Sequence, residues 1–226
     1  MGEPRRADDL SVFVNARLQS RRCPRKMVRP FAGTTLVEIC LETIAKLGWP
    51  RTWFGAHEEE LLDPARRFPG LRVYRRSAES ARSDSDPRRV FEILREIDTP
   101  WVMWINPCAP LVRVDTYRAA LASFLAGTAT SMTSVRELGG WFYSTDGRLL
   151  NDTGGNVDTM LATPILMVAH AFHIYPRERM LADGRPWPNA LGDPDLYRIP
   201  DAEAHDIDTE DEFETVEYLY RRRMHG

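Results

Sequence analysis

Two aspartates near the end of the chain have the spacing of a metal-binding pair. Asp206 and Asp208 flank Ile207 in the segment HDIDTED. In an extended segment alternate residues point to the same side, so the two carboxylates would lie together while Ile207 turns toward the core. Hard oxygen ligands suit Mg²⁺, which takes one or two carboxylates and completes its shell with phosphate and water. The pattern predicts a magnesium site at Asp206 and Asp208.

A purely structural role is also open for this segment. Asp208 or Thr209 could cap a helix, a common use of such residues at helix starts. Thr209 and Glu212 have capping-box spacing, and the pattern predicts a final helix over about 209–222. The two roles are compatible, because Thr209 can cap the helix while the aspartates bind metal.

A second group of chemically capable residues lies in the basic segment ARLQSRRCPRK, from Ala16 to Lys26. It contains five arginines or lysines and follows a predicted strand, and ligands of open α/β sheets bind beyond the carboxyl ends of strands. Cations spaced along such a loop can surround a triphosphate. The motifs GxxxxGK(S/T) and GxGxxG are absent, so neither a P-loop nor a dinucleotide site is expected. The alternative is an ordinary solvated basic surface.

Alternating strand and helix patterns position these groups. Thr35 and Glu38 have capping-box spacing and Gly48 follows the apolar periodicity, so a helix is predicted between them. The other predicted helices are 87–97, a segment around 117–125, and 209–222. Strands are predicted over 11–15, 52–56, 71–74, 101–105, 131–136 and 165–174.

This order predicts an α/β fold: one Rossmann-like, doubly wound domain over residues 1–226, with a mostly parallel sheet and helices on both faces. Residues 139–162 are rich in Gly, Asn, Asp and Thr and have little periodicity. A passive loop of this length is uncommon, so we expect an irregular insertion that is functional or forms a dimer arm.

Composition narrows the possible partners. The net charge of −3 argues against general attraction to nucleic acid. The three cysteines form no CxxC pair, and the N-terminal residues lack the apolar core of a signal peptide. The apolar stretch 165–175 is too short to span a bilayer. We therefore expect a reduced, cytoplasmic protein that binds neither nucleic acid nor membrane.

The basic segment, followed by FAGTTL, resembles the ARxxSxRxPxK…GxxL opening of the cytidylyltransferases of the acylneuraminate type. That family makes CMP-activated acidic sugars such as sialic, legionaminic and ketodeoxyoctonic acids, on a fold like that of the nucleotide-diphospho-sugar transferases. The resemblance implies that Ala16, Arg17, Ser20 and Lys26 bind the nucleotide, with the CTP phosphates at the last three.

Later segments resemble the same family in the same order. VYRRS matches its RP…D segment, which makes Arg76 similar to a nucleotide-contacting arginine, although Ser77 replaces proline. WVMWINPCAPLV resembles the strand that ends in LQPTSPLR, with Asn106 in place of the nucleoside-contacting Gln. DIDTEDEF resembles the DIDTxxDf signature and supports the metal site. Residues 140–159 resemble a stretch that contributes to the acceptor side and dimer interface.

The expected protein is a Mg²⁺-dependent homodimeric cytidylyltransferase that acts on CTP and a small acidic acceptor, a sialic acid-like sugar. Arg17, Lys26 and Asp208 are the expected catalytic residues. Positioning and charge neutralisation carry such an in-line displacement, in which the acceptor oxygen attacks the α-phosphorus and pyrophosphate leaves. No histidine is assigned as a base.

Three alternatives stay open. The acceptor could be a non-sugar acid such as a phosphonate. The chain could also be a degenerate nucleotide-binding module, because Ser77, Cys108, Ala109 and Val112 depart from the family pattern. A glycosyltransferase is a weaker possibility, based on the DxD spacing of the late aspartates.

Overall fold

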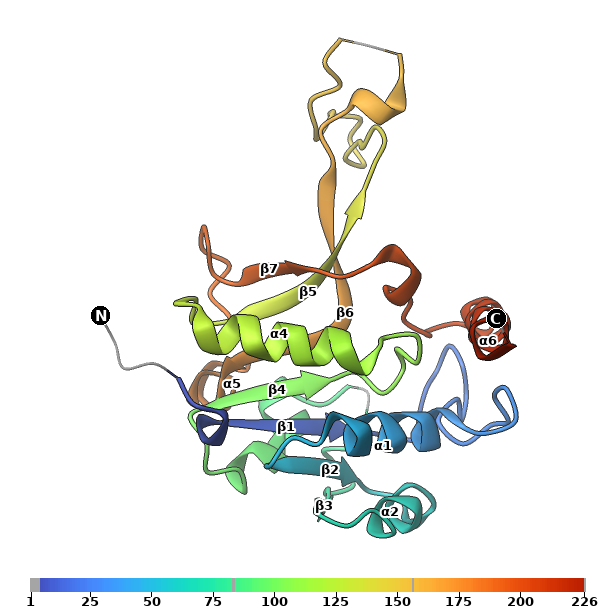
Figure 1. Cartoon of the computed structure of the whole chain (residues 1–226), viewed down its shortest axis with the longest axis vertical. Coiled ribbons are helices and arrows are strands. Elements are labelled where there is room, and N and C mark those ends of the chain that lie inside the picture. Colours follow the sequence, from blue (N-terminus) through green and yellow to red (C-terminus); the bar gives the residue numbers. More distant parts are fainter. Residues whose placement is uncertain (1–4, 83, 156, 226) are drawn as a thin grey trace.

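A computed structural model of the protein describes residues 5–82, 84–155 and 157–225. One seven-stranded sheet has the order β3-β2-β1-β4-β6-β5-β7 (Figure 1). Strands β1 to β4 run parallel, β6 is antiparallel to both of its neighbours, and β7 is parallel to β5. The strands are Leu10–Asn15, Thr52–Ala56, Leu71–Arg75, Trp101–Ile105, Met132–Leu138, Ile165–Pro176 and Asp195–Arg198. The predicted α/β fold with a mostly parallel sheet is confirmed.

Helices cover both faces of the sheet because successive residues of β1 point to opposite sides. Val12 and Val14 belong to a core shared with α1 and α4, whereas Phe13 belongs to a second core shared with α5. The helices are α1 (Leu36–Leu47), α2 (Glu59–Arg66), α3 (Pro87–Val90), α4 (Val114–Ala126), α5 (Arg177–Asp183) and α6 (Glu210–His225). Short 3₁₀ segments occupy Ala7–Asp9, Glu92–Arg95, Thr159–Leu161 and Asp201–Glu203.

The predicted helix boundaries at local caps are confirmed. The Thr35 hydroxyl accepts the N–H of Glu38 at the start of α1, and Gly48 ends that helix at φ 66°. Before α6, the Thr209 hydroxyl accepts the N–H of Glu212 at 3.3 Å, and the Glu212 carboxylate accepts the N–H of Thr209 at 2.8 Å. Both N-caps therefore form as their spacing indicates, and the one at Thr209 is a complete capping box.

The helix predicted over residues 87–97 is wrong beyond its first turn, because α3 ends at Val90. The Val90 carbonyl accepts hydrogen bonds from Asn15 Nδ2 at 2.9 Å, Arg76 Nη2 at 3.2 Å and Ser80 Oγ at 3.1 Å. A carbonyl directed to three side chains does not serve the N–H four residues later, so the α-helical ladder stops there. The chain continues as a 3₁₀ turn.

Three observed elements have no predicted counterpart: α2, α5 and β7. Helix α2 contains Pro64, which removes a backbone donor and reads as a helix breaker in sequence. Strand β7 has four residues at the sheet edge, too few to show a period-two pattern. These elements depend on packing rather than on periodicity.

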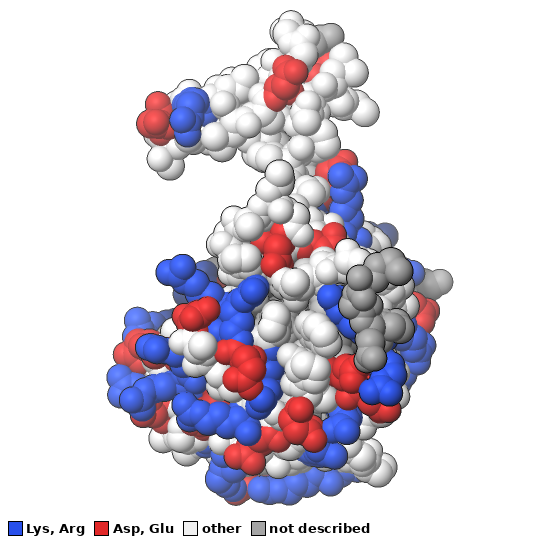
Figure 2. All heavy atoms as spheres, turned by 90° about the vertical axis from the view of Figure 1, so that its left-hand side faces the viewer, with Lys and Arg blue, Asp and Glu red and all other residues white. Residues whose placement is uncertain are grey.

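Strands β5 and β6 continue beyond the sheet into an arm that projects from the body (Figure 1). We define the arm as residues 139–164, between Leu138 and Ile165, which still pair. Asn151 joins the two ends of the arm, because its Nδ2 donates to the carbonyls of Gly140 at 2.9 Å and Thr163 at 2.7 Å. The arm contains the predicted irregular insertion. Figure 2 shows mostly uncharged surface over the arm and mixed charges over the body.

Among the described residues, no helix is both long and apolar enough to cross a membrane.

Gly55 of β2 leaves no room for a side chain beside Asn15. A Cβ there would lie 2.8 Å from Asn15 Oδ1 and 3.0 Å from Ile93 Cδ1. We expect Gly55→Ala to lower the free energy of unfolding by about 1–3 kcal/mol through overpacking. Urea denaturation measures this. Gly139→Ala is the control, because a Cβ there meets nothing within 4 Å. Equal stability of the two variants would contradict this packing.

Candidate functional site

A cleft of about 640 Å³ lies at the carboxyl ends of β1 and β4. In open α/β sheets this edge is where ligands bind. The loop after β1 forms one side, and the segment that precedes α6 reaches the same cleft from the far end of the chain. The structure brings together every predicted site residue here: Ala16, Arg17, Ser20, Lys26, Arg76, Asn106, Asp206 and Asp208.

The two aspartates have the predicted alternation. Ile207 is fully buried, while Asp206 and Asp208 both line the cleft. The segment belongs to no strand of the sheet. Instead the Ile207 N–H donates to the Cys108 carbonyl at 3.0 Å, so a single backbone bond anchors it beside the end of β4.

Asp208 pairs with two cations of the basic loop. Arg22 Nη2 lies 2.6 Å from one carboxylate oxygen and Lys26 Nζ lies 3.4 Å from the other. Lys26 also donates to the Ile207 carbonyl, and its side chain is 12% exposed. Burial lowers the pKa of Lys26, but interactions with the Cys108 thiol and the two aspartates outweigh it and raise that pKa. Lys26 is therefore a fixed positive charge in the cleft.

Asp206 offers a carboxylate oxygen of the kind that binds a hard cation. Burial, and then the nearby Asp208 charge, raise its pKa to about 6. Its buried Oδ1 has no hydrogen-bond partner among the described residues. Within those residues no cluster of three or more His, Cys, Asp or Glu side chains could hold a metal ion. The pair thus fits Mg²⁺ only as a two-carboxylate site completed by ligand or water oxygens.

Arg76 lies at the cleft but is 2% exposed. It donates to the Ala16 carbonyl at 2.9 Å, to Ser80 Oγ at 3.0 Å and to the Val90 carbonyl at 3.2 Å, and also to the Ser80 carbonyl. Burial, with a contribution from Arg17, lowers its pKa to about 10. The side chain therefore ties three segments around the cleft. Its contact with a nucleotide stays a prediction.

The other predicted residues differ in how far their polar atoms are already used in hydrogen bonds within the protein. Arg17 donates one hydrogen bond to a backbone carbonyl in the loop after β3, at 3.1 Å. Ser20 Oγ accepts the Cys23 N–H at 3.3 Å. Asn106, 8% exposed, accepts the Cys108 N–H at 3.0 Å through Oδ1. Ser20 and Asn106 thus shape the two loops, and Arg17 keeps donors for a ligand.

The cleft is also lined by residues for which no individual role was predicted, among them Arg21, Arg22, Phe91 and Trp104. Arg21 and Arg22 belong to the basic loop and reach the cleft with Arg17. Phe91 and Trp104 form an apolar wall, with ring centroids 6.2 Å apart and the rings perpendicular. The density of charge in the loop could have indicated the arginines. Nothing local indicates that Phe91 would turn toward Trp104.

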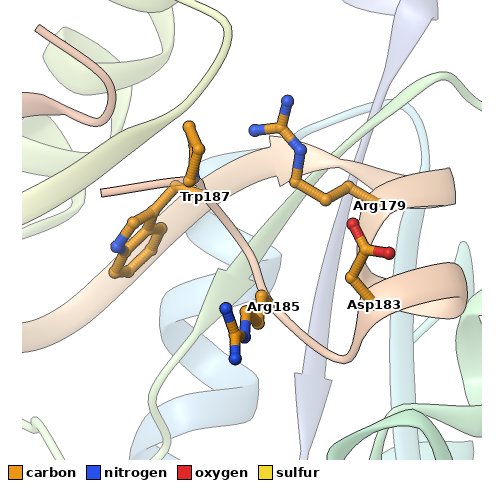
Figure 3. A pocket seen from close by; sticks show the side chains of 5 residues that line it. Arg179, Asp183, Arg185 and Trp187 are labelled. Carbon is orange, nitrogen blue, oxygen red and sulfur yellow. The ribbon is translucent and has the colours of Figure 1, made fainter. Parts of the chain in front are cut away.

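Two of the other hollows among the described residues are relevant to the site. One, of about 300 Å³, lies between β6 and α6, and its lining includes Arg136, His170, His205 and Asp206. Asp206 lines both this hollow and the cleft. Figure 3 shows the other, of about 590 Å³, lined by residues of α5 and the loop that follows it. No predicted site residue lines that one.

Replacement of Arg76 tests its structural role. Arg76→Met leaves buried carbonyl oxygens without their donors, so we expect the free energy of unfolding to fall by roughly 2–4 kcal/mol. Arg82 is an exposed arginine of the same loop, and within the described residues its side chain pairs with nearby Asp84, so Arg82→Met should leave the free energy of unfolding nearly unchanged. Chemical denaturation compares the two. Similar small losses would show that Arg76 does not hold the loops.

The raised pKa of Asp206 has a definite consequence for stability without metal. The folded state holds this proton more tightly than the unfolded state, so stability is lost as pH rises from about 4 to 6. Asp206→Asn removes that loss. In EDTA at pH 7 we expect the variant to be more stable than the wild type by roughly 1–3 kcal/mol, with little difference near pH 4. A less stable variant at pH 7 would contradict the raised pKa.

No known protein-family model matches the chain. Among solved structures it is similar to a CMP:2-keto-3-deoxy-manno-octonic acid synthetase complexed with CTP, at 13% identity over 95% of this chain and 99% of that one, with a TM-score of 0.66. A 4-diphosphocytidyl-2C-methyl-D-erythritol synthase from Anaerococcus prevotii is 12% identical over 95% and 98%, with a TM-score of 0.64. A cytidylyltransferase from Leptospira borgpetersenii is 14% identical over 92% and 85%, with a TM-score of 0.54. The chain has the α/β fold of these cytidylyltransferases.

Proposed function

We propose that the protein is a Mg²⁺-dependent cytidylyltransferase, which transfers CMP from CTP to a small acidic acceptor and releases pyrophosphate. The observation that carries this proposal is the contact between Lys26 and Asp208, whose charged atoms lie 3.4 Å apart in the cleft although they are 182 residues apart in the chain. It supports the proposal because cations of the kind that bind phosphates lie next to carboxylates that suit a metal ion. The fold shared with cytidylyltransferases supports the same reaction.

The nucleotide would use the cations that now pair with Asp208. A triphosphate offers several charged oxygens to Lys26 and Arg22, and charge-assisted bonds to phosphate are strong. Their transfer to the phosphates frees Asp208 to join Asp206 as a metal ligand. Mg²⁺, when bound, supplies charge neutralisation at the α-phosphate and lowers the pKa of the acceptor hydroxyl. Arg17 and Lys26 stabilise the charge that builds on the leaving pyrophosphate.

The nucleoside would lie on the opposite side of the cleft. Phe91 and Trp104 supply an apolar wall there, and Asn106 stands at the end of β4. Aromatic faces stack on bases, and an amide side chain can read their edges. We assign this wall to the cytosine end of CTP.

The acceptor would approach through the hollow on the other side of Asp206. Arg136 and His170 line this hollow, and the buried Nε of Arg136 has no partner among the described residues. Such donors fit an anionic acceptor, either an acidic sugar of the sialic acid type or a phosphonate. Ala109 and Val112, which depart from the family pattern, are 5% and 3% exposed and pack in the core. Their identities therefore do not argue against catalysis.

A homodimer is part of the proposal. The arm exposes large apolar side chains that a second copy of the chain could cover, and contiguous apolar surface of this kind commonly marks an interface. These are Trp141, Tyr143, Leu149, Leu150, Val157, Met160 and Leu161. We assign residues 139–162 to the dimer contact and to the acceptor side.

Pyrophosphate release from CTP and Mg²⁺ tests the reaction with a panel of acidic sugars and phosphonates. We expect turnover with at least one acid. Asp208→Asn should lower kcat by about 100-fold or more, because it removes a charge that binds metal. Asp115→Asn is the matched control: the Asp115 side chain is 88% exposed on α4 and, within the described residues, is paired with Arg118. Equal activity of both variants would contradict the assigned role of Asp208.

The alternative of a nucleotide-binding module gives a different result. It predicts Mg²⁺-dependent CTP binding in calorimetry with no turnover of any acid in the panel. Absence of CTP binding would contradict both functions.

A further inference from the structure

Strand β6 contains a bulge beside the hollow of about 300 Å³ that lies between β6 and α6. The pairs Thr133–His173 and Val135–Val168 bracket it, so β6 uses more residues than β5 over the same length. Between them, the Ser134 hydroxyl accepts the N–H groups of the two bulged residues 171 and 172 and donates to the carbonyl of residue 172, at 3.0–3.1 Å. The backbone groups that lose strand partners are thus satisfied by one side chain, which marks a specified feature.

The bulge redirects His170. Its φ is 51°, a left-handed conformation that is uncommon for a residue with a side chain. Bulges of this kind re-aim side chains next to active sites. His170 is exposed and lines the hollow that it shares with Asp206 and Arg136.

Two buried residues hold the His170 ring. His170 Nδ1 lies 3.1 Å from His173 Nε2, and His173 Nδ1 lies 2.7 Å from Thr133 Oγ1. His173 is 6% exposed. Trp104 stacks on it with ring centroids 5.2 Å apart. The ring of Trp187, which is labelled in Figure 3, lies with its centroid 5.0 Å from that of His173. The network therefore links the wall of the cleft to the hollow.

The direction of these hydrogen bonds follows from which groups carry a proton. Burial, and then the nearby His170, lower the pKa of His173 to about 3, so this ring is neutral and carries one N–H. Within the part of the chain that the structure describes, the Thr133 hydroxyl has no other acceptor, so it donates to Nδ1. His173 then carries its proton on Nε2 and donates it to His170 Nδ1. Neutral His170 is left with its proton on Nε2.

We propose that His173 and Thr133 are positioning residues, which fix the orientation and tautomer of His170 so that its Nε2–H donates to an anionic oxygen of the acceptor. That an acceptor binds beside His170 depends on the function proposed above. Neither His173 nor Thr133 touches the acceptor. Their effect is transmitted through one ring, and it changes which atom of His170 is a donor.

Nitrogen-15 NMR of the histidine rings tests the network without any substrate. In the full-length wild-type protein we expect His173 and neutral His170 both to be Nε2–H tautomers. Thr133→Val removes the hydroxyl donor and should shift His173 toward the Nδ1–H form. Thr133→Ser keeps the hydroxyl and should retain the wild-type tautomers. Nδ1–H tautomers in the wild type, or identical spectra of the Val and Ser variants, would overturn the proposal.

Steady-state kinetics test the effect on the acceptor, with 2-keto-3-deoxy-manno-octonic acid and methylphosphonate as the carboxylate and phosphonate probes. For the probe that reacts, Thr133→Val should raise the acceptor KM about fivefold and leave the CTP KM within about twofold, since one hydrogen bond is misdirected. Thr133→Ser should resemble the wild type. An equal rise in both KM values indicates general disruption and would overturn the positioning role. If neither probe reacts, the proposed function fails for these acids. The tautomers measured by NMR in the wild-type protein still test the hydrogen-bond network of Thr133, His173 and His170.

Discussion

The buried guanidinium of Arg76 is the interaction on which the site depends. It joins the end of β1, through the Ala16 carbonyl, to the loop after β3 and to the end of α3 at Val90. Its hydrogen bonds go to neutral oxygens. A charge held in this way remains costly to bury, and the lowered pKa of Arg76 expresses that cost. The bonds that offset the cost also fix the position of the loops.

The end of α3 shows how this contact shapes the cleft. Because the Val90 carbonyl bonds with Asn15, Arg76 and Ser80, the helix stops and Phe91 takes a different direction. Phe91 then packs edge-on against Trp104, with their rings at 90°. Arg76 thus helps to hold both the loop that carries the cations and the turn that carries Phe91. A cleft with these two sides can distinguish the phosphate end of a nucleotide from its base.

The carboxylate side of the cleft is arranged at a cost to stability. Asp206 is half-buried beside a second carboxylate, and its raised pKa shows that the charged form is disfavoured. Such tension is common at functional sites, where ligands rather than protein groups satisfy the charges. Asp208 is stabilised by Arg22 and Lys26, the same cations that a triphosphate would take. The site is therefore complementary to a ligand that carries both anionic oxygens and a cation.

The sequence by itself determined those features that depend on neighbours a few residues away. Thr35 and Thr209 begin helices because capping is a local hydrogen bond, and the alternation around Ile207 follows from backbone geometry. The basic loop and the aspartate pair each lie within a short stretch of sequence, so their residue types and spacing indicated phosphate binding and metal binding. Their meeting in one cleft followed from the predicted sheet and from the family resemblance.

Only the tertiary structure decided the rest, because long-range partners compete with local preference. The Val90 carbonyl accepts a hydrogen bond from Asn15, 75 residues away in the chain, and sequence periodicity does not indicate such a partner. Arg76 reads in sequence as a free cation, yet in the fold its donors are used by carbonyls from three segments. His170 and His173 read as isolated histidines, and a bulge in β6 makes them one network. Sequence pattern records which groups are present, and the fold decides which of them remain free to act.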